Sequence, residues 1–134
     1  MRTRQDIFMT IVLLSIVFLT GGCVSYPENM GDVFGVGHTD LEKARSTGIT
    51  KEIDLPRDKT FDKITGILKA GGLTIYQSNP DKGYIIVMGF PKQTDTTRVG
   101  IFFESAGQGR TSVTLSSLSS TALKKADRLI LEKL

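Results

Sequence analysis

This sequence of 134 residues lacks the residues that disulfides and histidine-rich sites require, since it contains one cysteine, Cys23, and one histidine, His38. A single cysteine cannot form a disulfide within the chain, so a folded domain must rely on its apolar core. A catalytic triad or metal site that uses histidine would have to be built around His38 alone. No other group of residues carries a catalytic, metal-binding or nucleotide-binding motif, and no enzymatic activity is expected.

Long apolar runs and a strong excess of one charge are also missing. The longest apolar run extends from Ile7 to Leu19. It is shorter than a bilayer-spanning helix, which needs about 20 residues. The formal net charge is +3, but Arg2 and Arg4 precede the apolar run and the other basic residues alternate with Asp and Glu. A permanent transmembrane helix and a nucleic-acid-binding surface are therefore not expected.

The first 23 residues have the layout of a secretory signal. The basic start of the chain is followed by the apolar run, which ends in small residues directly before Cys23. The stretch Leu19-Thr20-Gly21-Gly22-Cys23 resembles the lipobox of bacterial lipoproteins, a short apolar and small-residue segment that ends in an obligatory cysteine. Thr20 departs from the commonest form of that segment, which has leucine three residues before the cysteine.

The lipoprotein resemblance implies cleavage before Cys23, a diacylglyceryl thioether on its thiol and acylation of the new amino group. Several acyl chains hold a protein on a membrane lastingly, whereas a single chain binds marginally. Val24 follows the cysteine. In such families a residue other than aspartate there implies the outer membrane, on its periplasmic face, when the host has two membranes. The alternative is an ordinary signal peptide with a free thiol near its cleavage site.

The segment after the cysteine has the composition of a tether. Residues 24 to about 37 contain Gly, Pro and Asn without a sustained apolar period. Thr39 and Glu42 have the spacing of a capping box and predict a short helix to about Arg45, which would be marginal by itself. The expected organisation is a signal peptide at 1–22, a lipidated flexible tether at 23–46 and a globular domain at 47–134. His38 is then expected to be a solvated loop residue.

The rest of the chain changes between strand and helix patterns. The first expected elements are an edge strand at 49–55 and a helix that Asp58 caps and Gly71-Gly72 ends. Four strands are expected next, at 73–77 and 84–90 around a turn at 79–83, and then around 99–103 and 113–115. A final helix, capped by Ser119 or Ser120, is expected at the end. Gly83 is expected to take the left-handed conformation in the hairpin turn. The residues expected to face the core from the last two strands are Val99, Ile101, Phe103, Val113 and Leu115.

This order of strand, helix, four strands and helix predicts an α+β domain. Both helices must bury their apolar stripes against the same antiparallel sheet. The expected fold is therefore a two-layer sandwich, with two helices on one face of a sheet of four to five strands. In its element order and lipid anchor the domain resembles the small helix-on-sheet modules of envelope lipoproteins, of which BamC, an accessory subunit of an outer-membrane assembly machine, is an example.

Four aromatic residues are the strongest candidates for a binding surface. Tyr76, Tyr84, Phe90 and Phe102 lie out of phase with the residues expected to face the core. They predict an aromatic patch on the open face of the sheet, where another protein docks. The alternative is that these residues belong to the core or form cross-strand pairs.

Two polar groups admit a catalytic interpretation beside a structural one. A run of hydroxyl residues before Lys124 suggests a serine nucleophile with a lysine base, but the end of a strand and a helix cap explain it better. That run is Ser116, Ser117, Ser119, Ser120 and Thr121. Three carboxylates, Asp54, Asp58 and Asp62, suggest an acidic site, but negative charge near the start of a helix explains them as well.

These patterns predict a non-enzymatic envelope lipoprotein, held on a membrane by the lipid on Cys23. It would bind other envelope proteins as an accessory subunit of a complex, with no cofactor apart from the covalent lipid. The alternative is a periplasmic lipoprotein that binds a small apolar ligand in a groove between the helices and the sheet. Hydrolytic chemistry would require an acid–base pair that the sequence does not supply.

Overall fold

The computed structural model describes residues 37–93 and 97–134. The predicted signal peptide, Cys23 and most of the predicted tether lie outside these residues. The helices and strands are, in chain order, α2 (His38–Lys43), the 3-10 helix η3 (Ala44–Thr47), β1 (Ile49–Ile53), α3 (Arg57–Ala70), β2 (Thr74–Asn79), β3 (Tyr84–Met88), β4 (Val99–Ser105), β5 (Thr111–Ser116), α4 (Ser120–Ile130) and the 3-10 helix η4 (Leu131–Lys133).

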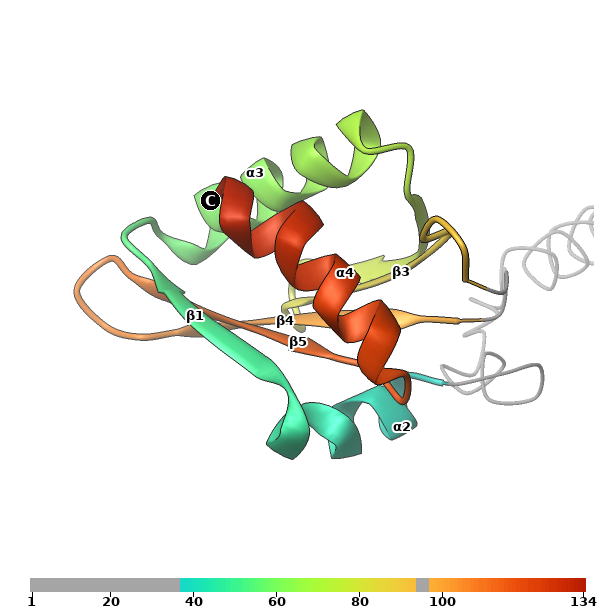
Figure 1. Ribbon diagram of the computed structural model, residues 1–134. Helices are drawn as coiled ribbons and strands as arrows, with labels where there is room; N and C mark the ends of the chain where they lie inside the picture. The colour runs from blue at the N-terminus through green and yellow to red at the C-terminus, as the bar shows by residue number, and fades with distance from the viewer. Residues whose placement is uncertain (1–36, 94–96) are drawn as a thin grey trace, which may run out of the picture.

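The five strands form one antiparallel sheet in the order β1-β5-β4-β3-β2 (Figure 1). Strands β2 to β5 follow one another as a meander, and β1 pairs with β5. Helix α3 carries the chain from the edge strand β1 to the opposite edge strand β2. The predicted α+β class, the four consecutive antiparallel strands and the edge strand before α3 are confirmed.

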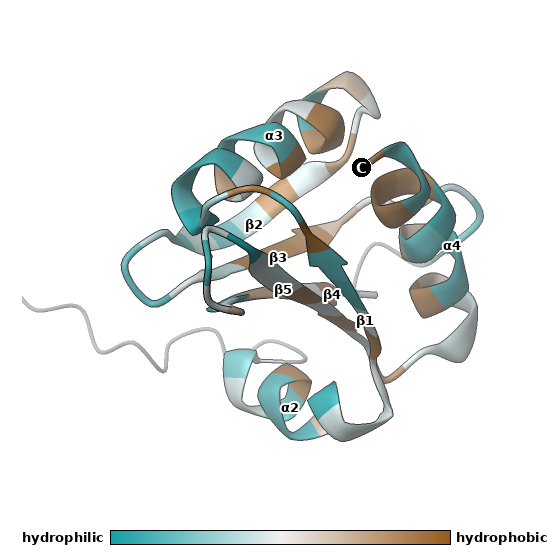
Figure 2. Cartoon of the chain, turned by 90° about the vertical axis from the view of Figure 1, so that its left-hand side faces the viewer, coloured by the Kyte–Doolittle hydropathy of each residue, from teal (hydrophilic) through white to brown (hydrophobic). Residues whose placement is uncertain are grey.

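The main core lies between one face of this sheet and the helices α3 and α4, as Figure 2 shows. Successive strand residues point to opposite faces, so alternate residues of β4 and β5 enter the core. The predicted set is confirmed, since all its members are buried there: Val99, Ile101, Phe103, Val113 and Leu115. Ala122, Ala126 and Ile130 of α4 recur at a spacing of four residues and are fully buried.

The two long helices begin in different ways. The Ser119 side chain caps α4, because its Oγ accepts a hydrogen bond from the Ala122 backbone N–H at 3.2 Å, as predicted. The prediction that Asp58 caps α3 is wrong. Pro56 occupies the N-cap, and Asp58 lies in the first turn, where its negative charge still complements the helix dipole.

The β2–β3 hairpin has the predicted turn. The Asn79 side chain accepts a hydrogen bond from the Lys82 backbone N–H at 2.9 Å, and the Asn79 carbonyl accepts one from Gly83 at 2.9 Å. Gly83 has φ of 71°, the left-handed conformation that glycine adopts without steric cost. This turn fixes how Tyr84 and the rest of β3 enter the sheet.

Helix α2 lies on the face of the sheet opposite α3 and α4 (Figure 2). Its Leu41 is completely buried. The packed domain therefore includes α2, which lies before the predicted start at residue 47. The predicted layer of two helices on one face is confirmed, and α2 adds a partial third layer that the sequence did not predict.

Substituting alanine at Gly83 and at Gly109 tests the packing of the hairpin. Both glycines have φ of +71°, but an alanine Cβ at Gly83 would lie 2.7 Å from the Phe103 carbonyl oxygen, whereas none would lie within 4 Å at Gly109. Gly109→Ala should cost about 1–2 kcal/mol, the penalty for a left-handed residue. Gly83→Ala should lower the free energy of unfolding, measured with urea, by clearly more than Gly109→Ala does, because β4 must also shift. Equal losses at the two sites would contradict the described turn.

Candidate functional site

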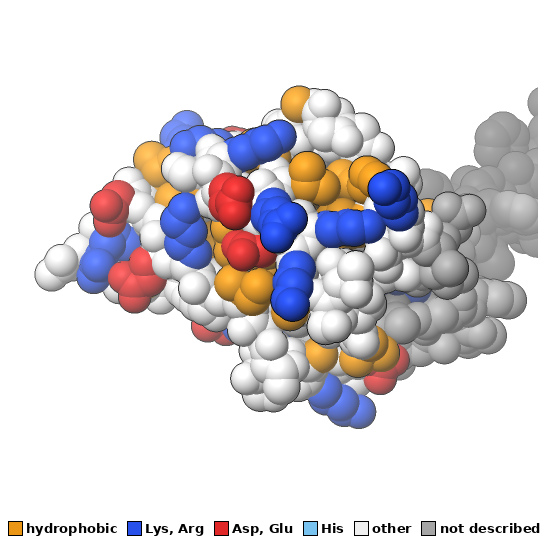
Figure 3. All heavy atoms as spheres, viewed as in Figure 1, with side chains coloured by type: hydrophobic (Ala, Val, Ile, Leu, Met, Phe, Trp, Pro, Cys, Tyr) orange, Lys and Arg blue, Asp and Glu red, His pale blue; other side chains and the backbone are white. Residues whose placement is uncertain are grey.

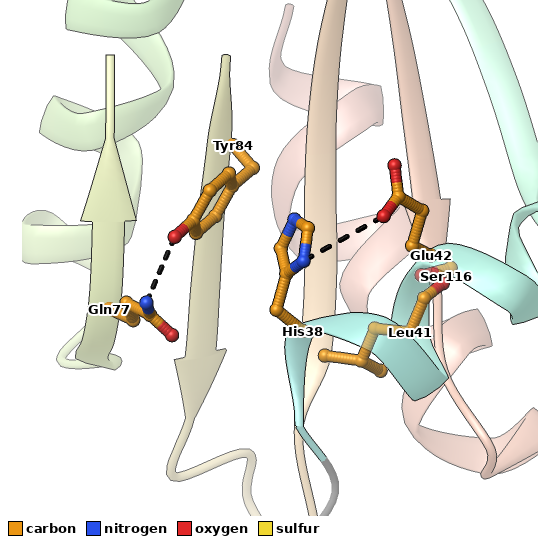
Figure 4. Close-up of polar contacts among 6 residues, drawn as sticks. All are labelled: His38, Leu41, Glu42, Gln77, Tyr84 and Ser116. Carbon is orange, nitrogen blue, oxygen red and sulfur yellow. Dashed lines mark hydrogen bonds and ion pairs between the residues drawn. The ribbon is translucent and has the colours of Figure 1, made fainter. Parts of the chain in front are cut away.

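The face of the sheet that α2 covers carries a second, smaller apolar cluster, formed by Leu41, Tyr84, Ile86 and Phe102. Tyr84 and Phe102 are directly opposite each other in the β3–β4 pairing, so their side chains lie on the same face. The ring of His38, the first residue of α2, packs on Tyr84 with a centroid separation of 4.3 Å (Figure 4). Leu41 is the apolar anchor of the helix on this face.

Polar contacts hold α2 in place over this cluster (Figure 4). The Ser116 hydroxyl of β5 donates a hydrogen bond of 2.6 Å to the Leu41 carbonyl oxygen. His38 Nδ1 lies 3.8 Å from a carboxylate oxygen of Glu42, one helical turn away. On the other side of the cluster, the Gln77 amide donates a hydrogen bond of 2.9 Å to the Tyr84 hydroxyl. These groups satisfy one another at the edge of a buried surface, as stability requires.

Arg45 closes the cluster at its other end. Its guanidinium lies 4.7 Å from the centroid of the Phe102 ring and forms an ion pair with Glu104 of β4. A cation over an aromatic face is attracted by the ring quadrupole. The contacts of α2 and η3 thus combine apolar burial, hydrogen bonding and charge, which explains how a helix of six residues is held in place.

His38 does not have the environment that the sequence suggested. The prediction of a solvated loop residue is wrong, because His38 belongs to α2 and its side chain is 30% exposed. The capping box is wrong as well, since the helix begins one residue before Thr39 and its N-cap is Gly37. The pattern of Thr39 and Glu42 did predict a helix here, but a single apolar residue, Leu41, gave no sign that the helix packs on the sheet.

The four aromatic candidates do not form one exposed patch. Tyr84, Phe90 and Phe102 are 3%, 3% and 4% exposed, and only Tyr76 is open to solvent, at 39%. Phe90 belongs to the main core, whereas Tyr84 and Phe102 belong to the cluster under α2. The prediction that all four share an open face is therefore wrong. Three of them are core residues because α2 and the main core each cover part of the set.

Tyr76 remains as an exposed aromatic on the edge strand β2. The pairing of β2 with β3 is irregular between Ile75 and Gln77, so Tyr76 lies at a bulge. The guanidinium of Arg98 lies 3.7 Å from the centroid of the Tyr76 ring. The stacked arginine orients the tyrosine ring and places a cation beside it, which makes this position a candidate contact for another protein.

Three of the hydroxyl groups considered above have structural partners, and the carboxylates lie on or just before α3. Ser116 bonds α2, Ser119 caps α4, and the Ser117 hydroxyl donates a hydrogen bond of 2.8 Å to the Arg98 carbonyl oxygen. Asp58 and Asp62 lie on α3, and Asp54 lies between β1 and that helix. Within residues 37–93 and 97–134, no group of three or more His, Cys, Asp or Glu side chains could hold a metal ion.

A surface hollow of about 340 Å³ lies where the connection after β3 meets α4. Its lining residues are Pro91, Lys92, Lys125, Arg128 and Leu129. Lys125 Nζ donates a hydrogen bond to the Pro91 carbonyl oxygen and so joins the two sides. Sequence analysis missed this site because its residues come from two segments more than thirty positions apart. No local pattern shows that these segments meet.

The sequence matches no protein-family model and no curated protein. In the part of the chain that the structure describes, no helix combines the length and apolar character needed to cross a membrane. The sequence patterns, the fold and the surfaces above are therefore the basis for any proposal about function.

Substituting Phe102 and Tyr76 separately tests the correction to the aromatic set. Phe102→Ala should lower the free energy of unfolding by about 3–5 kcal/mol, because it leaves a cavity under α2. Tyr76→Ala should cost less than about 1 kcal/mol, since the ring lies at the surface. Chemical denaturation of the two variants measures both values. A small effect of Phe102→Ala would show that this aromatic face is open in solution.

Proposed function

We propose that the protein is a bacterial envelope lipoprotein, anchored through lipid on Cys23, whose α+β domain acts as a non-enzymatic binding subunit of an envelope protein complex. The observation that carries the proposal is the stretch Leu19-Thr20-Gly21-Gly22-Cys23 at the end of a basic and then apolar segment. The outer membrane, on its periplasmic face, is the expected location in a host with two membranes, because Val24 rather than aspartate follows the cysteine.

The distance between the anchor and the domain supports this proposal. Gly37, the first residue that the structure describes, is the fourteenth residue after Cys23. An extended chain spans at most about 3.3–3.6 Å per residue, so such a connection reaches about 50 Å. The domain would therefore stay close to the membrane surface, with enough freedom to meet membrane proteins and lipid headgroups.

The β2 edge is the surface that we assign to the protein partner. Within the described residues, β2 pairs only with β3, so the outer side of β2 offers backbone donors and acceptors to an additional strand. Thr74, Tyr76 and Ser78 of this strand are exposed in alternation. An extended segment of another envelope protein can add to such an edge through backbone hydrogen bonds, while Tyr76 supplies a side-chain contact.

The alternative, a small apolar ligand between the helices and the sheet, has less support. Side chains of the main core occupy that space, among them Ile64, Leu68 and Ile130, which are completely buried. The hollow beside α4 lies at the surface and is lined by three cations as well as apolar residues. Its exposed lining is mostly apolar, with Lys92, Lys125 and Arg128 among the lining residues, so it suits an apolar group that carries negative charge.

Mass spectrometry of the membrane-extracted protein tests the anchor. The N-terminal peptide should begin at Cys23 and carry the mass of a diacylglyceryl group and an amide-linked acyl chain. Cys23→Ala should remove this modification, whereas Ser25→Ala, two residues further on, should leave it intact. An unmodified Cys23 in the wild-type protein would exclude the lipoprotein proposal.

Photo-crosslinking in intact cells tests the partner surface. A photoreactive amino acid in place of Tyr76 should give a discrete adduct with a second protein, because the β2 edge would lie against the partner. The same amino acid in place of Lys59, an exposed residue of α3, serves as the control. Adducts of the same size and yield at both positions, or none at Tyr76, would contradict this assignment of the edge.

A further inference from the structure

The hollow beside α4 gathers positive charge from two parts of the chain. Lys125 and Arg128 lie three residues apart on α4 and therefore share one face of the helix. Lys92 comes from the connection after β3 and lies at the same hollow. Neither Asp nor Glu lines it. Figure 3 shows Lys and Arg side chains over α4, with apolar surface between them and acidic side chains beside them.

A second hollow, at the start of α3, has a different character. It is lined by Asp58, Asp62 and Asp81 as well as Arg57, so its charges are mixed. Arg57 also donates hydrogen bonds of 2.6 and 2.8 Å to the carbonyl oxygens of Pro80 and Asp81. The two hollows therefore differ in the charge of their lining residues.

The chemistry of the hollow beside α4 suits an anion that is attached to an apolar group. An ammonium group has three donors, and the Pro91 carbonyl occupies one donor of Lys125. The guanidinium of Arg128, which is exposed, has the geometry to bind two phosphate oxygens at once. Most of the exposed lining is apolar and comes from Pro91, Leu129 and the aliphatic stems of the cationic side chains. Lys92 adopts φ of 60°, in the left-handed region.

The position of this hollow relative to the start of the domain also matters. Figure 1 shows the start of α2 at the end of the sheet where β3 ends and β4 begins. The anchor at Cys23 precedes Gly37 by fourteen residues. A connection of that length allows this end of the domain to reach the membrane surface.

We infer that the hollow formed by Pro91, Lys92, Lys125, Arg128 and Leu129 binds the phosphate headgroup of an anionic phospholipid in the membrane that carries the anchor. The inference rests on the proposed function, which supplies that membrane. Headgroup binding docks the domain with α4 toward the lipid. The anchor then limits the distance to the membrane, and the hollow sets the orientation.

Fluorescence quenching on vesicles tests this docking. The full lipidated chain is reconstituted in phosphatidylcholine vesicles, with or without 30% phosphatidylglycerol, together with a trace of lipid spin-labelled at the headgroup. In this chain lipidation blocks Cys23, so Gln93→Cys supplies the only free thiol for a fluorophore, directly after Lys92. A fluorophore at Gln108→Cys, in the β4–β5 hairpin, serves as the positional control. Quenching at position 93 should rise with phosphatidylglycerol, and quenching at position 108 should not.

A charge-matched pair of variants shows which cations are responsible. The triple variant Lys92→Gln, Lys125→Gln and Arg128→Gln removes three charges from the hollow. The control, with Lys59, Lys63 and Lys69 of α3 changed to Gln, removes three charges elsewhere. Each cation near an anionic surface contributes about a fivefold preference, so the first variant should lower the docked-to-undocked ratio on the order of a hundredfold. The control should change it little.

Three results would overturn the inference. The first is equal quenching with and without phosphatidylglycerol, and the second is phosphatidylglycerol-dependent quenching that the triple variant in the hollow leaves intact. The third is displacement by inorganic phosphate well beyond sodium chloride of equal ionic strength, which would identify a site for free anions. The mass of the Cys23 peptide, measured on the same preparation, separates failure of docking from failure of the lipoprotein proposal.

Discussion

Antiparallel pairing between β1 and β5 is the constraint on which the rest of this structure depends. It joins residues 49–53 to residues 111–115, segments far apart in the chain. Because β1 pairs there, α3 must cross the sheet to reach β2 at the opposite edge. The meander then returns to β5, and α4 lies beside α3 over the same face. The closure of the main core by the two helices follows from this single long-range pairing.

The same pairing determines what happens on the other face. β1 and β5 bring the chain that precedes residue 49 alongside the end of β5, where the Ser116 hydroxyl bonds the Leu41 carbonyl oxygen. Helix α2 is thereby placed over Tyr84 and Phe102. Strand alternation points these two aromatic side chains away from the main core, and α2 buries them on the opposite face of the sheet. In the proposed lipoprotein, the connection from the anchor ends on a helix that is itself part of the domain.

The two proposed surfaces use different residues and different physical effects. The β2 edge offers backbone hydrogen bonds and the Tyr76 ring, which suit an extended protein segment. The hollow beside α4 offers three cations around an apolar floor, which suit a lipid headgroup. A domain that uses both would present an edge strand to its partner while the membrane fixes its orientation. Variants of one surface leave the residues of the other unchanged, so the two proposals can be tested independently.

Local patterns in the sequence determined the elements of this protein, because each pattern acts through neighbouring residues. The alternation in β4 and β5, the left-handed Gly83 and the Ser119 cap could all be predicted, since strand pleating, steric freedom and capping act over a few residues. The stretch ending at Cys23, which resembles a lipobox, is local in the same sense, and lipidation there stays a prediction. Tertiary structure alone decided that Leu41 fixes α2 on the sheet, that Tyr84 and Phe102 are buried, and that Lys92 meets α4. These outcomes depend on contacts between distant segments, where one apolar residue or one lysine gives no local sign of its partner.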